Sequence, residues 1–512
     1  MKQKIIIIGA GVAGLTAAIY AQRCGFDVTL AEQHKIVGGM CTSWKRKGYL
    51  FEGAVHWLTG SSPETEAYQM WKDIGALGGD VPVSLHDPFR SVEWEGQTLH
   101  LYRDIEKTAE HLVGVSPDDG QLLRKLVKDV KAACRMQMPV FDVKGVKAAN
   151  PKKMSFGFLL KMMPAIPVAG RYGKMTCGDF AMRFKHPGIQ RLFRIVPDEY
   201  AATSLVFTLA TLHTGDGGYP EGGSLAMVQR MAKVFSDLGG RLLLNTRVRK
   251  VIVEDGKAAG VTLEDGALAD GTLADGRLAD GRLADGTLAD GRLDADAVIV
   301  TQETVAALDN LFDAPPQDAW IKELRDTVKP AVCTFVSIGV RAELPDGMLP
   351  EWKLEEPITY AGQEVHYASL NSYRQYAPEG STALTTALMG DTYGFWKEAK
   401  DSGRYDEEKQ ALAEQFVRAL CAKYPECEGK VEVIDIATPL TYERYTGAYH
   451  GSWMSVTEPG DKMKQYPGTC ESVEGLYFAG QRMMSPGGLP AAAASGRQAA
   501  QLLCRQFDEV FR

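Results

Sequence analysis

The sequence has no Cys-x-x-Cys pair, although nine cysteines are scattered along its 512 residues. An odd number of scattered cysteines fits neither a disulfide framework nor a zinc site. Free thiols are typical of proteins kept in a reducing compartment, so a cytoplasmic location is expected.

Long hydrophobic runs are missing as well. There is no stretch of 18 or more uninterrupted apolar residues, so no transmembrane helix is predicted. Residues 1–21 begin with lysine and continue with an apolar run, as a signal peptide does, but three glycines interrupt the run and no cleavage site follows. We therefore interpret these residues as part of the mature structure.

A basic excess is also absent: 57 lysines and arginines stand against 65 acidic residues, for a net charge of −8. A nucleic-acid binder needs a basic face, so no nucleic-acid partner is expected. The 45% hydrophobic and 24% charged residues are ordinary for a globular protein. Because one core rarely grows past about 250–300 residues, at least two cores are expected.

Glycine, in contrast, is abundant, and its first cluster lies between a predicted strand, residues 4–8, and a predicted helix, residues 15–24. Such a loop binds a dinucleotide, because its glycines allow a tight turn and the helix N-terminus favours the pyrophosphate. The next predicted strand ends in Glu32, 18 residues after Gly14, where a carboxylate can accept both ribose hydroxyls. This order predicts a Rossmann-type α/β domain that suits FAD or NAD. The loop reads Gly9-Ala-Gly11-Val-Ala13-Gly14.

A second glycine pair follows the acid, in Val37-Gly38-Gly39-Met40-Cys41, and the segment Gly48-Tyr-Leu-Phe-Glu52-Gly53-Ala-Val-His56 comes next. Together they resemble the extended fingerprint of the flavin-dependent amine oxidase and phytoene desaturase superfamily. The resemblance implies FAD as the cofactor. It also implies that Gly38, Gly39 and Met40 pass the ribityl-phosphate arm, and that a hairpin carries His56 near the flavin ring.

Two later blocks extend this resemblance along the chain. The first runs from Tyr219 through a predicted helix to residue 237 and a strand at Val248, whose backbone would pair with the adenine edge. The second resembles the C-terminal flavin motif of phytoene desaturase, carotenoid isomerase and retinol saturase relatives, in which a helix N-terminus faces the flavin. Many relatives have an acid where this chain has Gln481, whose amide can still bind the ribityl chain. The second block comprises Gly480, Gln481, Gly487, Gly488 and Leu489, with a helix of small residues over 491–501.

The positions of these blocks predict two interleaved domains, because all of the blocks must meet at one cofactor. The discontinuous FAD-binding domain is expected to comprise residues 1–75, 215–305 and 470–512. An α+β substrate-binding domain is expected from residues 76–214 and 306–469.

Residues 265–293 hold a pentapeptide tract of repeated Gly-x-Leu-Ala-Asp units between two predicted adjacent strands. The flanking strands favour an expanded hairpin loop. A partner-binding or calcium-binding solenoid is the alternative, but repeats need several stacked neighbours to bury a face.

The catalytic candidates are His56, Glu443 and Tyr445. His56 could act as an acid or base, or bind the cofactor, while a satisfied histidine in a buried hairpin is the alternative. Glu443 or Tyr445 could move a proton, and the alternative for Glu443 is a solvated pair with Arg444. No metal site is expected, because the nine histidines show no metal-ligand spacing. The chain has no second glycine-rich nucleotide loop, so electrons would be exchanged with a diffusible donor or acceptor.

The resemblance implies an FAD-dependent oxidoreductase that exchanges hydride between flavin N5 and a C–C or C=C bond of an apolar isoprenoid or lipid-like substrate. Three alternatives stay open: a redox-neutral polyene isomerase, an amine oxidase with Tyr445 and Tyr449 as its aromatic pair, and a non-catalytic flavin-holding scaffold. Residues 154–170 are apolar and methionine-rich with basic flanks. They are expected to touch a membrane surface peripherally or to form a buried helix pair.

Overall fold

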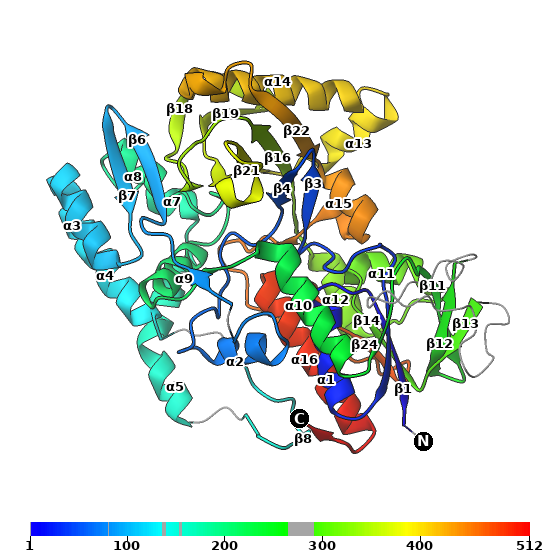
Figure 1. Ribbon diagram of the computed structural model, residues 1–512. Coiled ribbons are helices and arrows are strands. Elements are labelled where there is room, and N and C mark those ends of the chain that lie inside the picture. Colours follow the sequence, from blue (N-terminus) through cyan, green and yellow to red (C-terminus); the bar gives the residue numbers. More distant parts are fainter. Residues whose placement is uncertain (1, 80, 136–139, 153–155, 265–290) are drawn as a thin grey trace.

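The computed structural model describes residues 2–79, 81–135, 140–152, 156–264 and 291–512, and contains two five-stranded sheets and a helical layer (Figure 1). The first sheet is parallel throughout, in the order β10–β2–β1–β14–β24. Its central strand is the isoleucine run predicted from the sequence, and that run is buried from Ile5 to Ile8. The strands are β1 (Lys4–Ile8), β2 (Asp27–Ala31), β10 (Arg241–Leu243), β14 (Ala297–Val300) and β24 (Leu476–Phe478).

Three helices pack together beside this sheet: α1 (Val12–Arg23), α10 (Gly223–Asp237) and α16 (Gly488–Gln506) (Figure 1). The small residues of α16 let it approach α1 at backbone distance, since a Cβ on Gly496 would collide with the carbonyl oxygen of Ala13. Strand, glycine loop, helix and parallel strand follow in the predicted order. The predicted Rossmann-type α/β fold is therefore confirmed.

A three-stranded antiparallel sheet is formed by β11 (Val248–Glu254), β12 (Lys257–Leu263) and β13 (Arg292–Asp294). Thr262 pairs with Arg292, so the chain leaves β12 and enters β13 at neighbouring positions, as predicted for the strands beside the pentapeptide tract. The tract itself lies outside the described residues up to residue 290.

The second five-stranded sheet is antiparallel, in the order β17–β20–β21–β16–β22. Alternate residues of β16 point to opposite faces. Val336 and Ile338 join a core with Trp396 on one face, while the ring of Tyr49 lies against Gly339 on the other. The strands are β16 (Cys333–Val340), β17 (Gly347–Met348), β20 (Asn371–Tyr373), β21 (Thr382–Met389) and β22 (Val431–Ala437); the helices of this part are α13 (Tyr393–Asp401), α14 (Tyr405–Lys423) and α15 (Pro439–Thr446).

The helical layer lies on the left of Figure 1 and has a core of its own, built around Phe180, Phe184 and Phe193. It consists of α3 (Ile105–Val115), α4 (Gly120–Ala133), α5 (Phe156–Met162), α6 (Ile166–Tyr172), α7 (Cys177–Ala181), α8 (Pro187–Leu192) and α9 (Thr203–His213), with the hairpin β6 (Arg90–Trp94) and β7 (Gln97–Leu101). The helices α2 (Glu66–Asp73), α11 (Thr304–Asn310) and α12 (Ala319–Thr327) pack into the cores that contain the strands of the parallel sheet.

The remaining strands are β3 (Ser43–Arg46), β4 (Tyr49–Glu52), β5 (Val83–Ser84), β8 (Lys147–Ala148), β9 (Tyr219–Pro220), β15 (Pro330–Ala331), β18 (Trp352–Tyr360), β19 (Gln363–Ala368), β23 (Met454–Ser455) and β25 (Val510–Phe511).

The segment predicted either to touch a membrane or to form a buried helix pair forms α5 and α6. The buried-pair alternative is wrong for this segment, because Phe156, Met163 and Ile166 are exposed. Among the helices of the described residues, none is both long and apolar enough to cross a bilayer.

Candidate functional site

The first glycine loop closes tightly on itself at the carboxyl end of β1. Gly9 has a φ of +98°, and a Cβ on Gly14 would overlap the carbonyl oxygen of Gly9. The Thr301 hydroxyl, just past β14, donates to that same oxygen at 2.9 Å. Only glycine at position 14 lets α1 start this close to the strand, which brings the helix N-terminus over the loop.

The start of α1 is suited to bind an anion. Gly11 is the N-cap residue of α1, and no side chain caps the helix. The backbone amides of the first turn, where Ala13 and Gly14 lie, therefore stay available to a ligand. These amides and the positive end of the helix dipole are the elements that bind a pyrophosphate.

Glu32 follows β2 directly and is buried. Its Oε2 accepts from the Ala10 amide at 2.7 Å, and its Oε1 accepts from the His34 amide at 2.9 Å. Burial raises the pKa of Glu32, whereas the hydrogen bonds from the amides lower it. The carboxylate therefore fixes the glycine loop through Ala10, in addition to the ribose contact predicted for it.

The second glycine pair presses directly on the first loop. The Gly38 amide donates to the Ala10 carbonyl at 2.9 Å, and a Cβ on Gly39 would lie 3.4 Å from the Cα of Gly11. Both glycines have positive φ values, +124° and +57°. Met40 follows, partly exposed. The structure thus brings together the two loops that the sequence predicts for one dinucleotide.

The C-terminal block forms a third loop beside these two. Ser495 holds Gly480 from both sides, since its hydroxyl donates to the Gly480 carbonyl and accepts from the Gly480 amide, each at 2.9 Å. A Cβ on Gly487 would lie 2.6 Å from Oε1 of Gln481. Gly488 and Leu489 open α16, and the Gly488 amide donates to Oε1 of Gln481 at 3.5 Å. Gln481 thus lies at this loop, where the resemblance placed it.

A buried ion pair fixes the same loop. Nε of Arg482 lies 3.0 Å from Oε1 of Glu303, and both side chains are almost fully buried. Arg482 also donates to Ser455 at 2.5 Å and to the carbonyl of Met454 at 3.0 Å. Glu303 in turn accepts from the amide of Tyr449 at 3.3 Å. The sequence analysis did not single out Arg482 or Glu303.

Val248 begins β11 and is buried, paired with Leu263 across the small sheet. The neighbouring Arg247 carbonyl accepts from the Glu264 amide at 2.9 Å. The contact of Val248 with an adenine stays a prediction.

His56 lies among aromatic side chains of the second sheet. Its Nδ1 is 3.3 Å from the hydroxyl of Tyr373, and its ring stacks 6.3 Å from that of Phe335. Burial lowers the pKa of His56, against the opposing effect of Glu52. Burial also raises the pKa of Tyr373 well above its ordinary value. The neutral imidazole and the protonated phenol are therefore the stable forms near pH 7.

A fully buried carboxylate organises the backbone before His56. Glu52 accepts from the Ala54 and Val55 amides at 3.1 and 3.3 Å, from the Ser224 amide at 2.8 Å and from the Ser224 hydroxyl. The Tyr219 hydroxyl also contacts Glu52, at 3.1 Å, and lies 2.6 Å from the hydroxyl of Tyr376. Tyr219 and Glu52 belong to segments that the sequence singled out, but no sequence signal marks Tyr373 or Tyr376.

Glu443 and Tyr445 are not brought to His56 by the contacts of α15. Glu443 accepts the hydroxyl of Tyr393 at 3.1 and 3.2 Å. Tyr445 is 47% exposed, its carbonyl accepts from Gln33 at 3.3 Å, and its ring meets that of His34 edge-on at 5.6 Å. Tyr445 therefore lies against Gln33 and His34, the two residues that follow Glu32 in the chain.

Tyr445 and Tyr449, named for the aromatic pair of the amine-oxidase alternative, have different protein neighbours, and their position at a flavin ring stays a prediction. Tyr449 stacks on His450 at a centroid distance of 4.0 Å, and Tyr393 stacks on the opposite face of His450 at 4.1 Å. His450 has a φ of +53°. The two tyrosines therefore have different partners.

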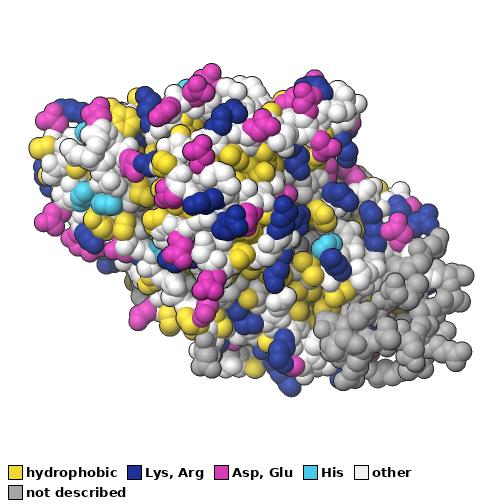
Figure 2. Space-filling model, turned by 45° about the horizontal axis from the view of Figure 1, so that its top comes forward, with side chains coloured by type: hydrophobic (Ala, Val, Ile, Leu, Met, Phe, Trp, Pro, Cys, Tyr) yellow, Lys and Arg dark blue, Asp and Glu magenta, His cyan; other side chains and the backbone are white. Residues whose placement is uncertain are grey.

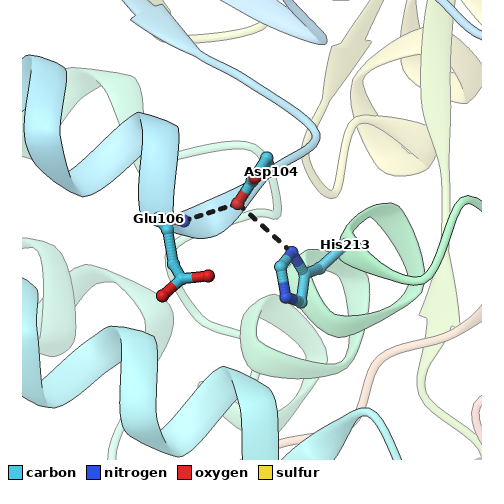
Figure 3. Close-up of side chains that lie close together, drawn as sticks. All are labelled: Asp104, Glu106 and His213. Atoms are coloured by element: carbon cyan, nitrogen blue, oxygen red, sulfur yellow. Dashed lines mark hydrogen bonds and ion pairs between the residues drawn. The ribbon is translucent and has the colours of Figure 1, made fainter.

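One group of side chains could hold a cation. Asp104, Glu106 and His213 lie together between the start of α3 and the end of α9 (Figure 3). Asp104 accepts from the Glu106 amide at 2.8 Å as the N-cap of α3, and lies 3.5 Å from Nδ1 of His213. Helix capping accounts for Asp104, and both acids are exposed, so the group by itself indicates no metal site.

The comparisons with known proteins agree with this geometry. The family of flavin-containing amine oxidoreductases matches residues 12–504. The chain is 31% identical to the neurosporene-forming phytoene desaturase of Rhodobacter capsulatus, over 51% of this chain and 50% of that protein. It is 24% identical to the chloroplastic prolycopene isomerase of Daucus carota, over 96% of this chain and 78% of that protein. The match to the desaturase thus spans about half of that relative's length.

Among solved structures, an oxidoreductase from Methanosarcina mazei superposes with a TM-score of 0.57 at 18% identity, covering 96% of this chain and 98% of that one. At this identity the likeness concerns the fold alone. It supports the overall fold described above.

Proposed function

The chain belongs to the family of flavin-containing amine oxidoreductases, with FAD as its cofactor, and from this premise we propose that it acts on a C–C or C=C bond of an apolar substrate. The substrate class is isoprenoid or lipid-like, and the reaction is saturation or desaturation. Bound FAD supplies hydride transfer at N5. The observation that carries this proposal is the position of His56, four residues after the β3–β4 hairpin that follows the two glycine loops, and against the aromatic face of the second sheet.

The residues present fit FAD at several points. Two helices, α1 and α16, begin at glycine N-caps; no side chain caps α1, and at α16 the Gly488 amide donates to Oε1 of Gln481 at 3.5 Å, so the first-turn amides of α1 suit the phosphates and Gln481 lies where α16 would face the flavin. A Cβ on Gly14 or Gly38 would collide with neighbouring backbone, so the loops admit only glycine there. The buried Glu32 carboxylate suits two ribose hydroxyls. Gly9, Gly11, Ala13, Gly39, Met40, Val248, Gly480, Gln481, Gly487, Gly488 and Leu489 complete the proposed binding set.

We assign the acid–base role to His56 with Tyr373. The Tyr373 hydroxyl is protonated and lies 3.3 Å from Nδ1, so it can donate to Nδ1 when the neutral imidazole carries its proton on Nε2, and it can accept from Nδ1 in the other tautomer. In the saturating direction, the ring takes up a proton from solvent, and the imidazolium passes its Nε2 proton to the substrate carbon beside the one that has received hydride, which returns the ring to its neutral form. In the reverse direction, a neutral ring whose Nε2 is unprotonated takes the proton from that carbon and releases it to solvent. Glu443 and Tyr445 are weaker candidates, because their contacts involve Tyr393, Gln33 and His34.

The substrate side of the proposal rests on the relatives and on the surroundings of His56. The relatives' names refer to phytoene and prolycopene. Phe335, Tyr373 and Trp44 form the nearby surface, since the rings of Trp44 and Phe335 meet at 5.8 Å. An aromatic surface of this kind favours an apolar chain without a charged group.

A redox-neutral polyene isomerase is the second candidate function. It is favoured by the match to the prolycopene isomerase, which extends over 96% of this chain, whereas the match to the desaturase covers 51%. Proton transfer by His56 serves this reaction as well.

We also propose two further partners: a diffusible electron donor or acceptor, and a membrane surface that touches residues 154–170.

The proposal includes a division of the chain into two domains. The parallel sheet would head a discontinuous FAD-binding domain of residues 1–75, 215–305 and 470–512, and the antiparallel sheet a substrate domain of residues 76–214 and 306–469.

An anaerobic experiment tests this function. The FAD of the purified protein is reduced, and polyenes, enones and amines are added separately while flavin absorbance and product double bonds are followed. Reoxidation by an enone or polyene with loss of a double bond supports the saturase direction. Rearrangement of a polyene with the flavin still reduced supports the isomerase. Reduction of oxidised flavin by an amine alone would overturn both. The Tyr373→Phe variant should keep its FAD and react more slowly.

A further inference from the structure

An unusual run of large apolar side chains faces water on residues 156–172, a helical segment that consists of α5, a short 3-10 turn and α6 and that we name the apolar arm. Phe156 is 75% exposed, Met163 57% and Ile166 64%, and Leu159 and Leu160 are about half exposed. These positions recur every three or four residues, so they form one stripe along the helical surface. A stripe of this kind normally faces a protein core, but here it faces outward.

The arm is held firmly on its inner side. Ala165, Val168 and Tyr172 are buried in or against the core of the helical layer. The Tyr172 hydroxyl donates to Asp129 of α4 at 2.9 Å, and Arg171 forms an ion pair with the same carboxylate at 2.6 Å. The orientation of the arm is therefore fixed, with its apolar stripe outward. Figure 1 places α5 at the lower left edge of the molecule.

The chain that enters the arm is anchored to the flavin-side helix α16. The Asp142 carboxylate accepts from Arg497 at 2.7 Å and from Gln501 at 2.6 Å, and both Asp142 and Arg497 are almost fully buried. The amide of Val143 donates to Gln501 at 3.0 Å. Contact of the arm with a surface would therefore orient the whole molecule, because the arm's base belongs to the nucleotide-binding part.

The charge around the arm is opposite to that of the rest of the chain. Residues 140–185 contain nine lysines and arginines and two aspartates, a net charge of +7 in a chain whose total is −8. Three of these cations pair with acids: Lys147 with Asp508, Arg171 with Asp129, and Lys185 with Asp118. Lys144, Lys174 and Arg183 are exposed. Elsewhere the two signs are interspersed, as on the face shown in Figure 2.

We infer that the apolar arm and its basic flanks form a docking surface for a bilayer that contains anionic lipid. Apolar side chains enter the acyl region while lysine and arginine bind the lipid phosphates, and the two contributions add. A second copy of this chain is a poorer occupant, because a twofold contact would bring two positive surfaces together. The inference rests on the proposed function and deepens it, since it names the surface at which an apolar substrate would be met.

The test is flotation of the FAD-loaded protein with vesicles of phosphatidylcholine alone or with 30% phosphatidylglycerol, at about 0.1 M salt. We expect binding to the anionic vesicles and at least about tenfold weaker binding to the neutral ones. The variant F156S/L160S/I166S should lose at least about tenfold in affinity. Its matched control carries L85S/V253S/M463S, three exposed apolar residues outside the arm.

The charge contribution is tested by K174E/R183E against the control K322E/R249E, which makes the same charge change at exposed residues elsewhere. The first should weaken anionic-vesicle binding at least about tenfold and the second much less. The inference would be overturned if both charge variants lost the same affinity for anionic vesicles, or if the wild type bound neutral and anionic vesicles equally. It would also be overturned if F156S/L160S/I166S bound anionic vesicles as the wild type does. A wild-type dimer that the apolar variant converts to monomer, with no vesicle binding, would overturn it in favour of a second copy.

This test is independent of the proposed chemistry, because FAD content and anaerobic flavin reoxidation are measured on the same samples. If the protein does not bind vesicles but an enone still reoxidises its flavin, only the docking surface is refuted. Vesicle binding that depends on the arm in a protein whose flavin reacts only with amines would refute the proposed function and leave the surface standing.

Discussion

Substitution of Gly14 by alanine should damage FAD binding far more than its size suggests. A Cβ at this position would lie 1.8 Å from the carbonyl oxygen of Gly9, whereas ordinary van der Waals contact begins at 3.4 Å. It would also lie 2.9 Å from Oγ1 of Thr301, which donates to that same carbonyl. The loop and α1 must therefore move apart by about 1.6 Å along this direction.

The expected free-energy cost follows from this displacement. Overpacking a close-packed site by one methyl group usually costs about 1–3 kcal/mol. The upper end applies here, because the obstructing atom belongs to the backbone of Gly9 and is fixed on both sides by β1 and Thr301. If about 3 kcal/mol is lost from the bound state, the dissociation constant of FAD rises about 100-fold.

The assay is equilibrium titration of the apoprotein with FAD, together with thermal unfolding of the apo form. The matched control is Gly114→Ala, which makes the same change at a helical glycine of α3 where a Cβ would meet nothing within 4 Å. Alanine there should stabilise the protein or leave it unchanged. If Gly14→Ala binds FAD as tightly as the wild type and unfolds at the same temperature, the steric reasoning is refuted.

Three other changes have equally definite outcomes. Because burial lowers the pKa of His56 below the value of about 6.5 in the unfolded chain, the unfolded state binds the proton more readily, so stability should fall as pH drops below about 6.5. Between pH 7.5 and 5.5, the melting temperature of His56→Asn should fall less than that of the wild type. If the two curves of melting temperature against pH run parallel, this reasoning is contradicted. Arg482→Met should cost about 3–5 kcal/mol in urea unfolding by leaving Glu303 buried without its cation, and E303Q/R482M should lose less than the sum of the two single changes. Deletion of residues 267–291 leaves the four residues 263–266 between the paired residues Thr262 and Arg292, enough for a hairpin loop, so FAD content and melting temperature should not change. Loss of FAD would show that the tract has a role at the cofactor.

The parts of the molecule that could be predicted from sequence are those specified by local rules. β1, the glycine loop, α1 and Glu32 follow one another within 32 residues, and each has a residue type that its backbone or its ligand requires. The start of α16 is equally local, since Gly487 and Gly488 have φ values of +108° and +84°. Such positions are readable because no other residue type fits them.

The surroundings of His56 could not be predicted in the same way. Its partner Tyr373 is 317 residues away, on a short strand whose place in the sheet depends on pairing with β21. Glu52 meets Ser224, 172 residues further along the chain. These contacts arise from tertiary packing between segments far apart in the chain, for which a single sequence has no periodic signal. Glu443 and Tyr445 lie on α15, which directly follows β22 in the chain. Their neighbours are nevertheless long-range: Glu443 contacts Tyr393, and Tyr445 contacts Gln33 and His34.

The Glu52 network makes the position of His56 dependent on the start of α10. Glu52 binds the Ala54 and Val55 amides just before His56, and it also binds both polar groups of Ser224, the second residue of α10. Gly223 lies against this carboxylate, and a Cβ there would collide with it and with the Tyr219 hydroxyl. A displaced α10 would therefore shift His56 relative to Tyr373 without touching either side chain. Since α10 also packs against α1, the helix that begins at the proposed phosphate site, one rigid unit joins the glycine loop to the imidazole proposed as acid and base. The proposed reaction brings a flavin ring and a proton to adjacent carbons, and it needs such a fixed separation, because small displacements at a reacting centre reduce rates steeply.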